Sequence, residues 1–471
     1  MTSEELSAAS GSAASGSAAS GSAASGSAQP GPDPADGVSV RRMLALATSA
    51  FLVLAAEPLY LLVDTAVVGH LGAHALGALA VGTTLMALLA IVGTFVEYGT
   101  TARAARWFGS DQRDRAVAEG VQASYLAIGI GIVVVVVGQL TADPLVRLLT
   151  GPSSSLHEPA VQWFRIALCG MPMVLLVLAG NGWMRGVQLT RTPVAIVLVA
   201  NGLSAAACPL LVYTAGLGLT GSAWANLGAQ LVAAGLFLVA LHREAVRREH
   251  LSLAPHPEVM RAQLVLGRDL IVRAAAFQAA FMVAAGVAAR MGTAQIAAHQ
   301  IGMQLWELTA LLLDSFAIAA QALVGAALGA SAASAARRLA VQVAQWSAGA
   351  GTAFAIVFAA GWWVIPRLFT SSPAVWHQCH LLWPWFVVML PAAGIVFGLD
   401  GVLIGAGDVA FLRSITIVAA LGGYVPITLA AAYWDWGIGG VWAGLTAFIV
   451  LRLVGMVWRA RSDRWVVLGS A

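Results

Sequence analysis

The stretch EPLYLLVDTAVVGHLG, residues 57–72, places two carboxyl side chains and a proline inside a long apolar run. Residues 43–69 are together long enough to cross a hydrocarbon core about 30 Å thick as a helix. Glu57 and Asp64 lie about two helical turns apart and therefore share one face. An ionisable group inside a span costs about 2.5–3.5 kcal/mol on insertion scales, and such groups mark ion or substrate pathways. Pro58 removes a backbone hydrogen bond and is expected to serve as a hinge.

The rest of the chain has the composition of an integral membrane protein. Of its 471 residues, 59% are hydrophobic and 10% are charged, whereas an ordinary soluble domain carries about 25% charged residues. Because lipid offers the backbone no hydrogen-bond partners, the apolar segments must be helices. We predict an all-α integral membrane protein with twelve transmembrane helices, at residues 43–69, 75–107, 116–141, 158–182, 190–214, 218–242, 264–290, 295–328, 337–366, 374–400, 410–433 and 437–460.

The arginines orient these helices. With the N-terminus in the cytoplasm, eighteen arginines fall at or near inside connections, and only Arg147, Arg290 and Arg367 fall outside. Cytoplasmic loops carry the excess of positive charge, so we expect a multi-pass protein of the inner membrane with both termini cytoplasmic. The predicted organisation is a disordered Ser/Ala/Gly-rich tail (1–40), an N-lobe (41–242), a cytoplasmic loop (243–263), a C-lobe (264–465) and a short C-terminal tail (466–471).

The two halves carry matching sequence. An offset of 220 residues sets LGAHALGALAVG (71–82) against MGTAQIAAHQIG (291–302), pairs Gly72 with Gly292, and also pairs Gly109 with Gly329. GWMRGVQLT (182–190) matches GVLIGAGDV (401–409) at an offset of 219. The repeat predicts two pseudo-symmetric six-helix lobes, related by an axis along the membrane normal, with substrate held between them.

A second acidic segment lies in the C-lobe. HQIGMQLWELTALLLDSF (299–316) again places two carboxylates, Glu307 and Asp314, two turns apart. Together with Gln300, Trp306 and the N-lobe residue Tyr60, they are candidates for the wall of a substrate cavity, where aromatic rings could contact flat or cationic compounds. The alternative is that these acids only fix helix packing through hydrogen bonds. For Glu97 an ion pair between helices is the expected role.

The chain lacks the motifs of the common enzyme classes. It has no GxSxG, HExxH or P-loop, and its three cysteines stand singly in apolar surroundings without metal-ligand spacing. We therefore expect a transporter rather than an enzyme or an ATP-driven pump, with no cofactor, no bound metal and no nucleic-acid partner.

Three stretches resemble the multidrug and toxic compound extrusion (MATE) transporters, in particular the DNA-damage-inducible F (DinF) branch. They are residues 57–72, AAHQIGMQLWELTALLLDSFAIAAQALVGAALG and MRGVQLTRTP, and the likeness covers about residues 41–462. The resemblance implies two six-helix lobes around a V-shaped cavity, and export of organic cations in exchange for protons or sodium. It also implies that Asp64 is the coupling aspartate.

The chain departs from this family in one helix. Related sequences often carry Asn and Asp four residues apart in the fifth helix, whereas NGLSAAACPLLVY (201–213) places Ser204 and Cys208 there. Sodium needs hard oxygen ligands, so a thiol in place of a carboxylate favours protons. Asn201 is a candidate hydrogen-bond partner for Asp64.

The sequence therefore favours a secondary active antiporter that exports small organic cations or drugs, acts as a monomer and uses the proton gradient, with sodium less favoured. Asp64 would be the site of protonation and coupling, assisted by Glu57. Burial favours the protonated form of a carboxyl group and an approaching cation favours the ionised form, so proton and cargo would compete. The alternatives are a flippase or exporter of a lipid-linked or metabolite substrate, and a membrane-embedded enzyme acting on lipid.

Overall fold

The computed structural model describes residues 40–151, 154–248 and 254–469, and every regular element in these ranges is helical. The predicted tail of residues 1–40 lies outside them, apart from Val40. The first half contains α1 (Val40–Gly69), α2 (Ala73–Gly109), α3 (Arg113–Thr150), α4 (His157–Leu168), α5 (Met171–Gly186), α6 (Arg191–Pro209), the π-helical turn η1 (Leu210–Thr214) and α7 (Leu219–Val246).

The second half repeats this order. It contains α8 (Pro257–Met291), α9 (Thr293–Gly329), α10 (Ala333–Ala360), the short α11 (Ile365–Phe369), α12 (Pro373–Gly405), α13 (Val409–Ala419), the π-helical turn η2 (Ala420–Tyr424), α14 (Val425–Tyr433), α15 (Gly437–Arg461) and the turn η3 (Asp463–Trp465). We call α1–α7 the N-lobe and α8–α15 the C-lobe.

The prediction of twelve membrane-spanning helices is confirmed when one bent pair is counted as a single span. Eleven helical stretches among the described residues are long and apolar enough to cross a membrane, and α4 and α5 form the twelfth with a bend of 48° between them. Pro172 stands in the first turn of α5, where a proline needs no backbone N–H partner and begins a new helix readily.

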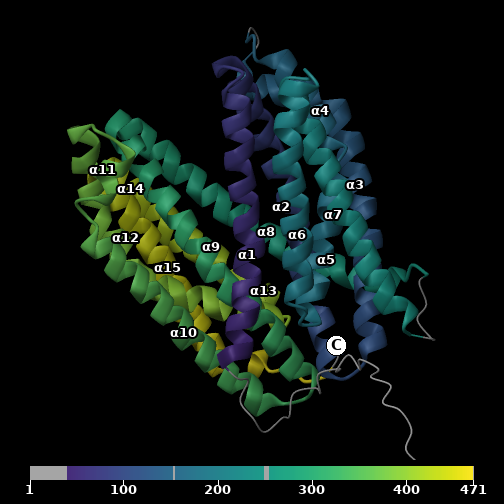
Figure 1. Cartoon of the computed structure of the whole chain (residues 1–471). Helices are drawn as coiled ribbons and strands as arrows, with labels where there is room; N and C mark the ends of the chain where they lie inside the picture. The colour runs from purple at the N-terminus through teal and green to yellow at the C-terminus, as the bar shows by residue number, and fades with distance from the viewer. Residues whose placement is uncertain (1–39, 152–153, 249–253, 470–471) are drawn as a thin grey trace, which may run out of the picture. The chain divides into compact units, whose positions relative to one another are not determined.

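The two halves have largely separate hydrophobic cores. Buried apolar residues of the N-lobe form clusters that include Trp163, Phe164, Trp183 and Phe237. The C-lobe core is centred on α9, α12 and α15, and the first turns of α1 pack against it through Met43 and Leu46. The lobes meet where α1 contacts α9 and where α2 contacts α8 and α9; Figure 1 shows α1 running alongside both groups of helices.

The sequence repeat corresponds to a reciprocal contact between the lobes. A Cβ atom on Gly109, at the end of α2, would overlap the carbonyl oxygen of Ala326 on α9. A Cβ atom on Gly329, at the end of α9, would overlap the carbonyl oxygen of Arg106 on α2. Both pairs of positions are related by the 220-residue offset, so the glycines that match in sequence occupy equivalent places at one pseudo-twofold crossing.

The same equivalence holds inside each lobe. Gly182 of α5 packs against the backbone of Glu97 on α2, and Gly401 of α12 packs against the backbone of Ala317 on α9. Gly72 and Gly292 are the N-cap residues of α2 and α9, with φ values of 109° and 139°, which residues with a side chain rarely adopt. Close helix packing and these two helix starts explain why the repeat is visible mainly in glycines.

Crowding at the crossing gives a first prediction. Gly329→Ala places a methyl group against the Arg106 carbonyl, so the helices must separate, and overpacking of this kind costs about 1–3 kcal/mol. We expect a lower melting temperature of the purified protein in detergent. The matched control is Gly349→Ala in α10, where nothing lies within 4 Å of the added atom. Equal melting temperatures for the two variants would contradict the close crossing.

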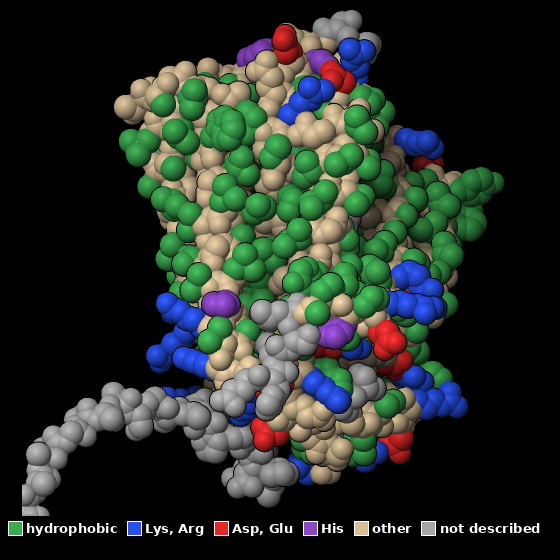
Figure 2. Space-filling view, turned by 90° about the vertical axis from the view of Figure 1, so that its right-hand side faces the viewer, with side chains coloured by type: hydrophobic (Ala, Val, Ile, Leu, Met, Phe, Trp, Pro, Cys, Tyr) green, Lys and Arg blue, Asp and Glu red, His purple; other side chains and the backbone are tan. Residues whose placement is uncertain are grey.

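The surface is that of a protein embedded in a membrane. Large apolar side chains are widely exposed, for example Leu140 at 79% and Leu148 at 82%. Figure 2 shows hydrophobic side chains across the middle of one face, with the charged side chains gathered toward its ends. Exposing such a band of apolar side chains to water would be unfavourable, whereas contact with lipid tails is not.

Candidate functional site

A cavity of about 240 Å³ lies inside the N-lobe and is walled by α1, α2 and α4–α7. We call it the N-lobe cavity. The side chains of Glu57, Tyr60 and Asp64 all line it from α1, which confirms that the two acids share one face of the helix. Polar groups also reach it from the other helices, namely Glu97, Asn181, Arg185, Asn201, Asn226 and Gln230.

Asp64 is held in the wall of this cavity with 2% of its surface exposed. The thiol of Cys208 on α6 donates to it, with Sγ 3.2 Å from Oδ1, and the hydroxyl of Ser222 on α7 is a second neutral partner. Cys208 itself is fully buried. Asn201 lines the cavity, but the contact described between α6 and Asp64 comes from Cys208, about two turns further along α6. The expectation that Asn201 would bond to Asp64 is therefore replaced by the thiol contact.

Asp64 differs from every other carboxylate that is at most 7% exposed in the described ranges. Five such groups are present: Asp64, Glu97, Glu119, Asp269 and Asp400. Glu97 pairs with Arg185, Glu119 with Arg103, Asp269 with Arg413, and Asp400 with Arg273 and Arg452. Among the residues described, Asp64 alone of the five has no arginine or histidine within ion-pair distance. The Glu97–Arg185 contact is the ion pair between helices that was expected for Glu97.

The remaining α1 and α6 candidates surround Asp64 at different depths. Glu57 lines the cavity with an exposed side chain, and Tyr60 is 6% exposed. Ser204 is buried behind the wall rather than lining the cavity, and its hydroxyl oxygen has no hydrogen-bond partner among the described residues. Of the two acids that line this cavity, Glu57 is therefore the more exposed and Asp64 the more buried.

Pro58 lies inside α1, which continues unbroken from Val40 to Gly69. Because proline has no N–H, the carbonyl of Leu54 loses its helical partner. Leu54 lines both this cavity and a second one in the C-lobe. The weak point of α1 thus lies in the wall between two cavities, and its use as a hinge stays a prediction.

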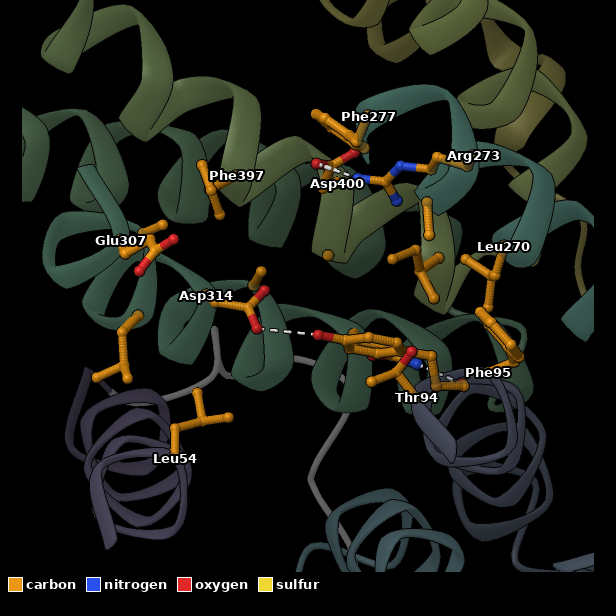
Figure 3. A pocket seen from close by; sticks show the side chains of 18 of the residues that line it. Leu54, Thr94, Phe95, Leu270, Arg273, Phe277, Glu307, Asp314, Phe397 and Asp400 are labelled. Atoms are coloured by element: carbon orange, nitrogen blue, oxygen red, sulfur yellow. Dashed lines mark hydrogen bonds and ion pairs between the residues drawn. The ribbon is translucent and has the colours of Figure 1, made fainter. Parts of the chain in front are cut away.

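The second cavity, of about 470 Å³, is walled mainly by α8, α9 and α12 and also by α1, α2 and α15. We call it the C-lobe cavity, and Figure 3 shows its lining. Trp306, Glu307 and Asp314 line it, as the sequence suggested. Gln300 is exposed and lines neither cavity. It shares the face of Glu307 but lies two turns nearer the start of α9, before the cavity lining begins at Trp306.

Opposite α9, the C-lobe cavity carries an ionic triad that the sequence did not assemble. Arg273 of α8 and Arg452 of α15 both donate to Oδ2 of Asp400 on α12, each at 2.6 Å. The side chain of Arg452 is 2% exposed, that of Asp400 7% and that of Arg273 13%. Figure 3 shows Arg273 and Asp400 side by side with Phe277. The available signal was a charge within an apolar span at each of the three positions.

A further contact joins the lobes within this cavity; it agrees with the alternative stated for Asp314, a hydrogen bond that fixes helix packing, but the sequence did not identify its partner. The hydroxyl of Tyr98 on α2 donates to Oδ2 of Asp314 on α9 at 2.9 Å. Tyr98 lines the C-lobe cavity although it belongs to an N-lobe helix.

In the described ranges, no three His, Cys, Asp or Glu side chains come together as a set that could hold a metal ion.

Comparison with known proteins gives consistent results along most of the chain. The family model described as MatE matches residues 49–210 and 270–429. The chain is 32% identical to the Arabidopsis thaliana protein DETOXIFICATION 44, chloroplastic, covering 93% of this chain and 86% of that protein. It is 31% identical to DNA damage-inducible protein F of Escherichia coli strain K12, covering 87% of this chain and 90% of that protein.

Solved structures with the same fold include two described as transporters or by the family name. One is entitled "Crystal structure of MATE in the bent conformation", with a TM-score of 0.80, 21% identity, and coverage of 89% of this chain and 94% of the other. Another shows the outward-facing conformation of a multidrug resistance MATE family transporter of the MOP superfamily, with a TM-score of 0.78, 20% identity, and coverage of 88% and 94%.

Proposed function

This chain belongs to the MatE family of membrane transporters, in its DinF-like branch, and from that premise we propose that it exports small organic cations in exchange for protons bound at Asp64. As a member of this family it is a secondary transporter rather than an enzyme. Relatives named as multidrug resistance proteins support drugs and toxins as the cargo. We place it in the inner membrane with both termini cytoplasmic, acting as a monomer because one chain contains both lobes.

The observation that carries this proposal is the unpaired burial of Asp64. A buried charge is costly unless it is paired, and the four other carboxylates described here that are at most 7% exposed each have an arginine. The partners of Asp64 are both neutral, namely the thiol of Cys208 and the hydroxyl of Ser222. Two states remove the cost, since the group can hold a proton or can hold a cation. The two states exclude each other, and that exclusion is what exchange requires.

The surroundings of Asp64 provide a route for each partner. Glu57, on the same face of α1, is exposed within the N-lobe cavity and is placed to pass protons or attract a cation toward Asp64. Tyr60 lies between them along the helix and offers an aromatic face. A change in α1 near Pro58 would alter the exposure of this whole face, because the helix lacks a backbone hydrogen bond at Leu54.

The reciprocal crossing of α2 and α9 supports alternating access. The lobes are in backbone contact at Gly109 and Gly329, next to the arginine-rich connections that the positive-inside rule assigns to the cytoplasm. This contact would close the cytoplasmic side in the present state, and release of cargo would occur on the other side. Rocking of one lobe against the other would then close the outer side and open the cytoplasmic side.

The pairing of the arginines that line the two cavities argues against a flippase for lipid-linked pyrophosphates. Such cargo needs free basic groups facing the cavities. Of the arginines that line them, Arg185 pairs with Glu97, and Arg273 and Arg452 share Asp400. Each is neutralised at least in part by the protein itself, so organic cations fit the acidic face of α1 better.

Proteoliposomes with imposed gradients test both the activity and its coupling ion. We expect a pH gradient, acidic outside, to drive export of a fluorescent organic cation such as ethidium, and a sodium gradient of the same size to have little effect. Equal or greater transport with sodium alone would overturn the proton assignment. The absence of transport with any gradient would overturn the exporter assignment itself.

The thiol at position 208 allows a sharper prediction about the coupling ion. Sodium prefers several hard oxygen ligands, and Cys208→Asp adds a carboxylate beside Asp64. We expect this variant to acquire transport that responds to sodium, whereas Cys208→Ser, which adds no charge, stays driven by protons. The measurement is the ratio of the sodium-driven to the pH-driven rate in proteoliposomes. An unchanged ratio in Cys208→Asp would contradict the role given to Cys208.

A further inference from the structure

Two consecutive residues of α2 face the two cavities. Glu97 lines the N-lobe cavity, and Tyr98 lines the C-lobe cavity. Neighbouring residues on a helix point about 100° apart, so one turn of α2 can form part of both walls. No residue of the proposed exchange at Asp64 lies in the C-lobe cavity, which leaves open what the larger cavity and this shared wall contribute.

The shared turn of α2 is held from both lobes. On the N-lobe side, the Glu97 carboxylate pairs with the buried guanidinium of Arg185 on α5, and Gly182 packs against the Glu97 carbonyl. On the C-lobe side, the Tyr98 hydroxyl donates to Asp314 at 2.9 Å, and Nε2 of Gln321 donates to the Tyr98 carbonyl oxygen at 2.6 Å. Movement of this turn in one lobe is therefore resisted by side chains of the other.

The strength of the Tyr98 contact depends on the charge of Asp314. A hydrogen bond to an ionised carboxylate is roughly twice as strong as one between neutral groups, and Asp314 has no ion-pair partner among the described residues. Figure 3 shows Asp314 facing the cavity with its bond running to the ring hydroxyl on α2. A proton on Asp314 would weaken its hydrogen bond with Tyr98. The turn of α2 that also carries Glu97, the partner of Arg185, would then be held less firmly.

The charged groups that face Asp314 come from several helices. Asp314 interacts electrostatically with charged groups of three other helices of the two lobes, Arg185 of α5, Arg273 of α8 and Asp400 of α12. It also interacts with Tyr98 and Glu97 of α2. Glu307 of its own helix and Arg452 of α15 line the same cavity, and Glu57 of α1 acts on Glu97. Glu97 is already paired with Arg185, and Asp400 with its two arginines. The hydrogen bond from Tyr98 is therefore the direct contact whose strength changes when Asp314 takes up a proton.

We propose that Tyr98 is a positioning residue through which the proton state of Asp314 in the C-lobe cavity adjusts cation binding in the N-lobe cavity. This inference rests on the proposed exchange at Asp64 and adds a second, indirect proton to it. Binding of one cation would then be linked to two carboxyl groups, to Asp64 by direct competition and to Asp314 through Tyr98 and the Glu97–Arg185 pair.

The test measures how steeply cation affinity depends on pH. Ethidium binding to the purified full-length protein in lipid nanodiscs is followed across the pH range in which affinity changes, and the slope of log affinity against pH counts the protons released. We expect a slope above one for the wild type. We expect a slope of at most one for Tyr98→Phe, Asp314→Asn and the double variant alike, because all three remove the same hydrogen bond between Tyr98 and Asp314. The matched control is Tyr433→Phe, at a position 81% exposed on α14.

The outcomes separate this inference from the proposed function. A wild-type slope in Tyr98→Phe, or single effects that add in the double variant, would overturn the role of Tyr98. If Tyr98→Phe does not fold, a wild-type slope in Asp314→Asn overturns the link from its other end. Asp64→Asn tests the exchange site by itself: it should lose ethidium binding, and wild-type binding with a wild-type slope in that variant would be a failure of the exchange mechanism, distinguishable from a failure at Tyr98.

Discussion

Asp64→Asn is expected to reduce pH-driven uptake of a fluorescent organic cation into everted membrane vesicles to the rate of vesicles that lack the protein. Asparagine nearly preserves the shape of the side chain but can neither take up a proton nor neutralise a cation. The buried position beside Cys208 is therefore occupied by a group with one state instead of two. Without two states that exclude each other, proton flow and cargo flow are no longer linked.

Two controls make this loss specific. The amount of inserted variant should match the wild type, because the amide oxygen of asparagine can still accept from the Cys208 thiol and the substitution leaves no charged partner unpaired. Asp143→Asn changes a carboxylate that is half-exposed and paired with Arg165 at the surface, and it should transport normally. Transport at the wild-type rate by Asp64→Asn would refute the assignment of the exchange site.

Asp400→Leu is expected to have the largest effect on stability. Its carboxylate is the shared acceptor of Arg273 and Arg452, so the substitution leaves two guanidinium groups without it in the wall of the C-lobe cavity. Removing one partner of a buried ion pair costs about 3–5 kcal/mol, which is a large part of the roughly 5–15 kcal/mol that stabilises a typical folded domain. We expect little folded protein in the membrane, as measured by fluorescence size-exclusion chromatography of the solubilised protein.

A compensated variant shows whether unpaired charge is the cause. Replacing all three members together, as Arg273→Met, Asp400→Leu and Arg452→Met, removes the charges and keeps the volume, and such replacements are often neutral or stabilising. We expect this triple variant to regain most of the folded yield. If the triple variant is as unstable as Asp400→Leu alone, the cost comes from lost shape rather than from the charges.

The helices and the repeat could be predicted from the sequence because their causes are local. The length of an apolar segment decides whether it spans the membrane, and the arginines of each connection decide its side. The face shared by Glu57 and Asp64 follows from their spacing on one helix. The matched glycines signalled the crossing of α2 with α9 because close backbone contact excludes a Cβ atom at Gly109 and Gly329.

The polar contacts that define the two cavities could not be predicted in this way. The bonds of Cys208 to Asp64, Tyr98 to Asp314 and Arg452 to Asp400 each join different helices, and their formation depends on how those helices are rotated. Spacing along one helix does not contain that information. For the same reason Asn201 was the expected partner of Asp64, although a thiol further along the same helix holds that place.

The most direct measurement of the exchange site is the infrared difference spectrum of the purified protein on addition of cargo. In the absence of cargo Asp64 should hold a proton, so the wild type should show the carbonyl stretch of a protonated carboxyl group that disappears when the cation binds. Asp64→Asn should lack that band. A wild-type spectrum in which no protonated carboxyl group assigned to Asp64 is present before cargo, or in which that band persists after the cation has bound, would contradict competition between proton and cargo at this residue.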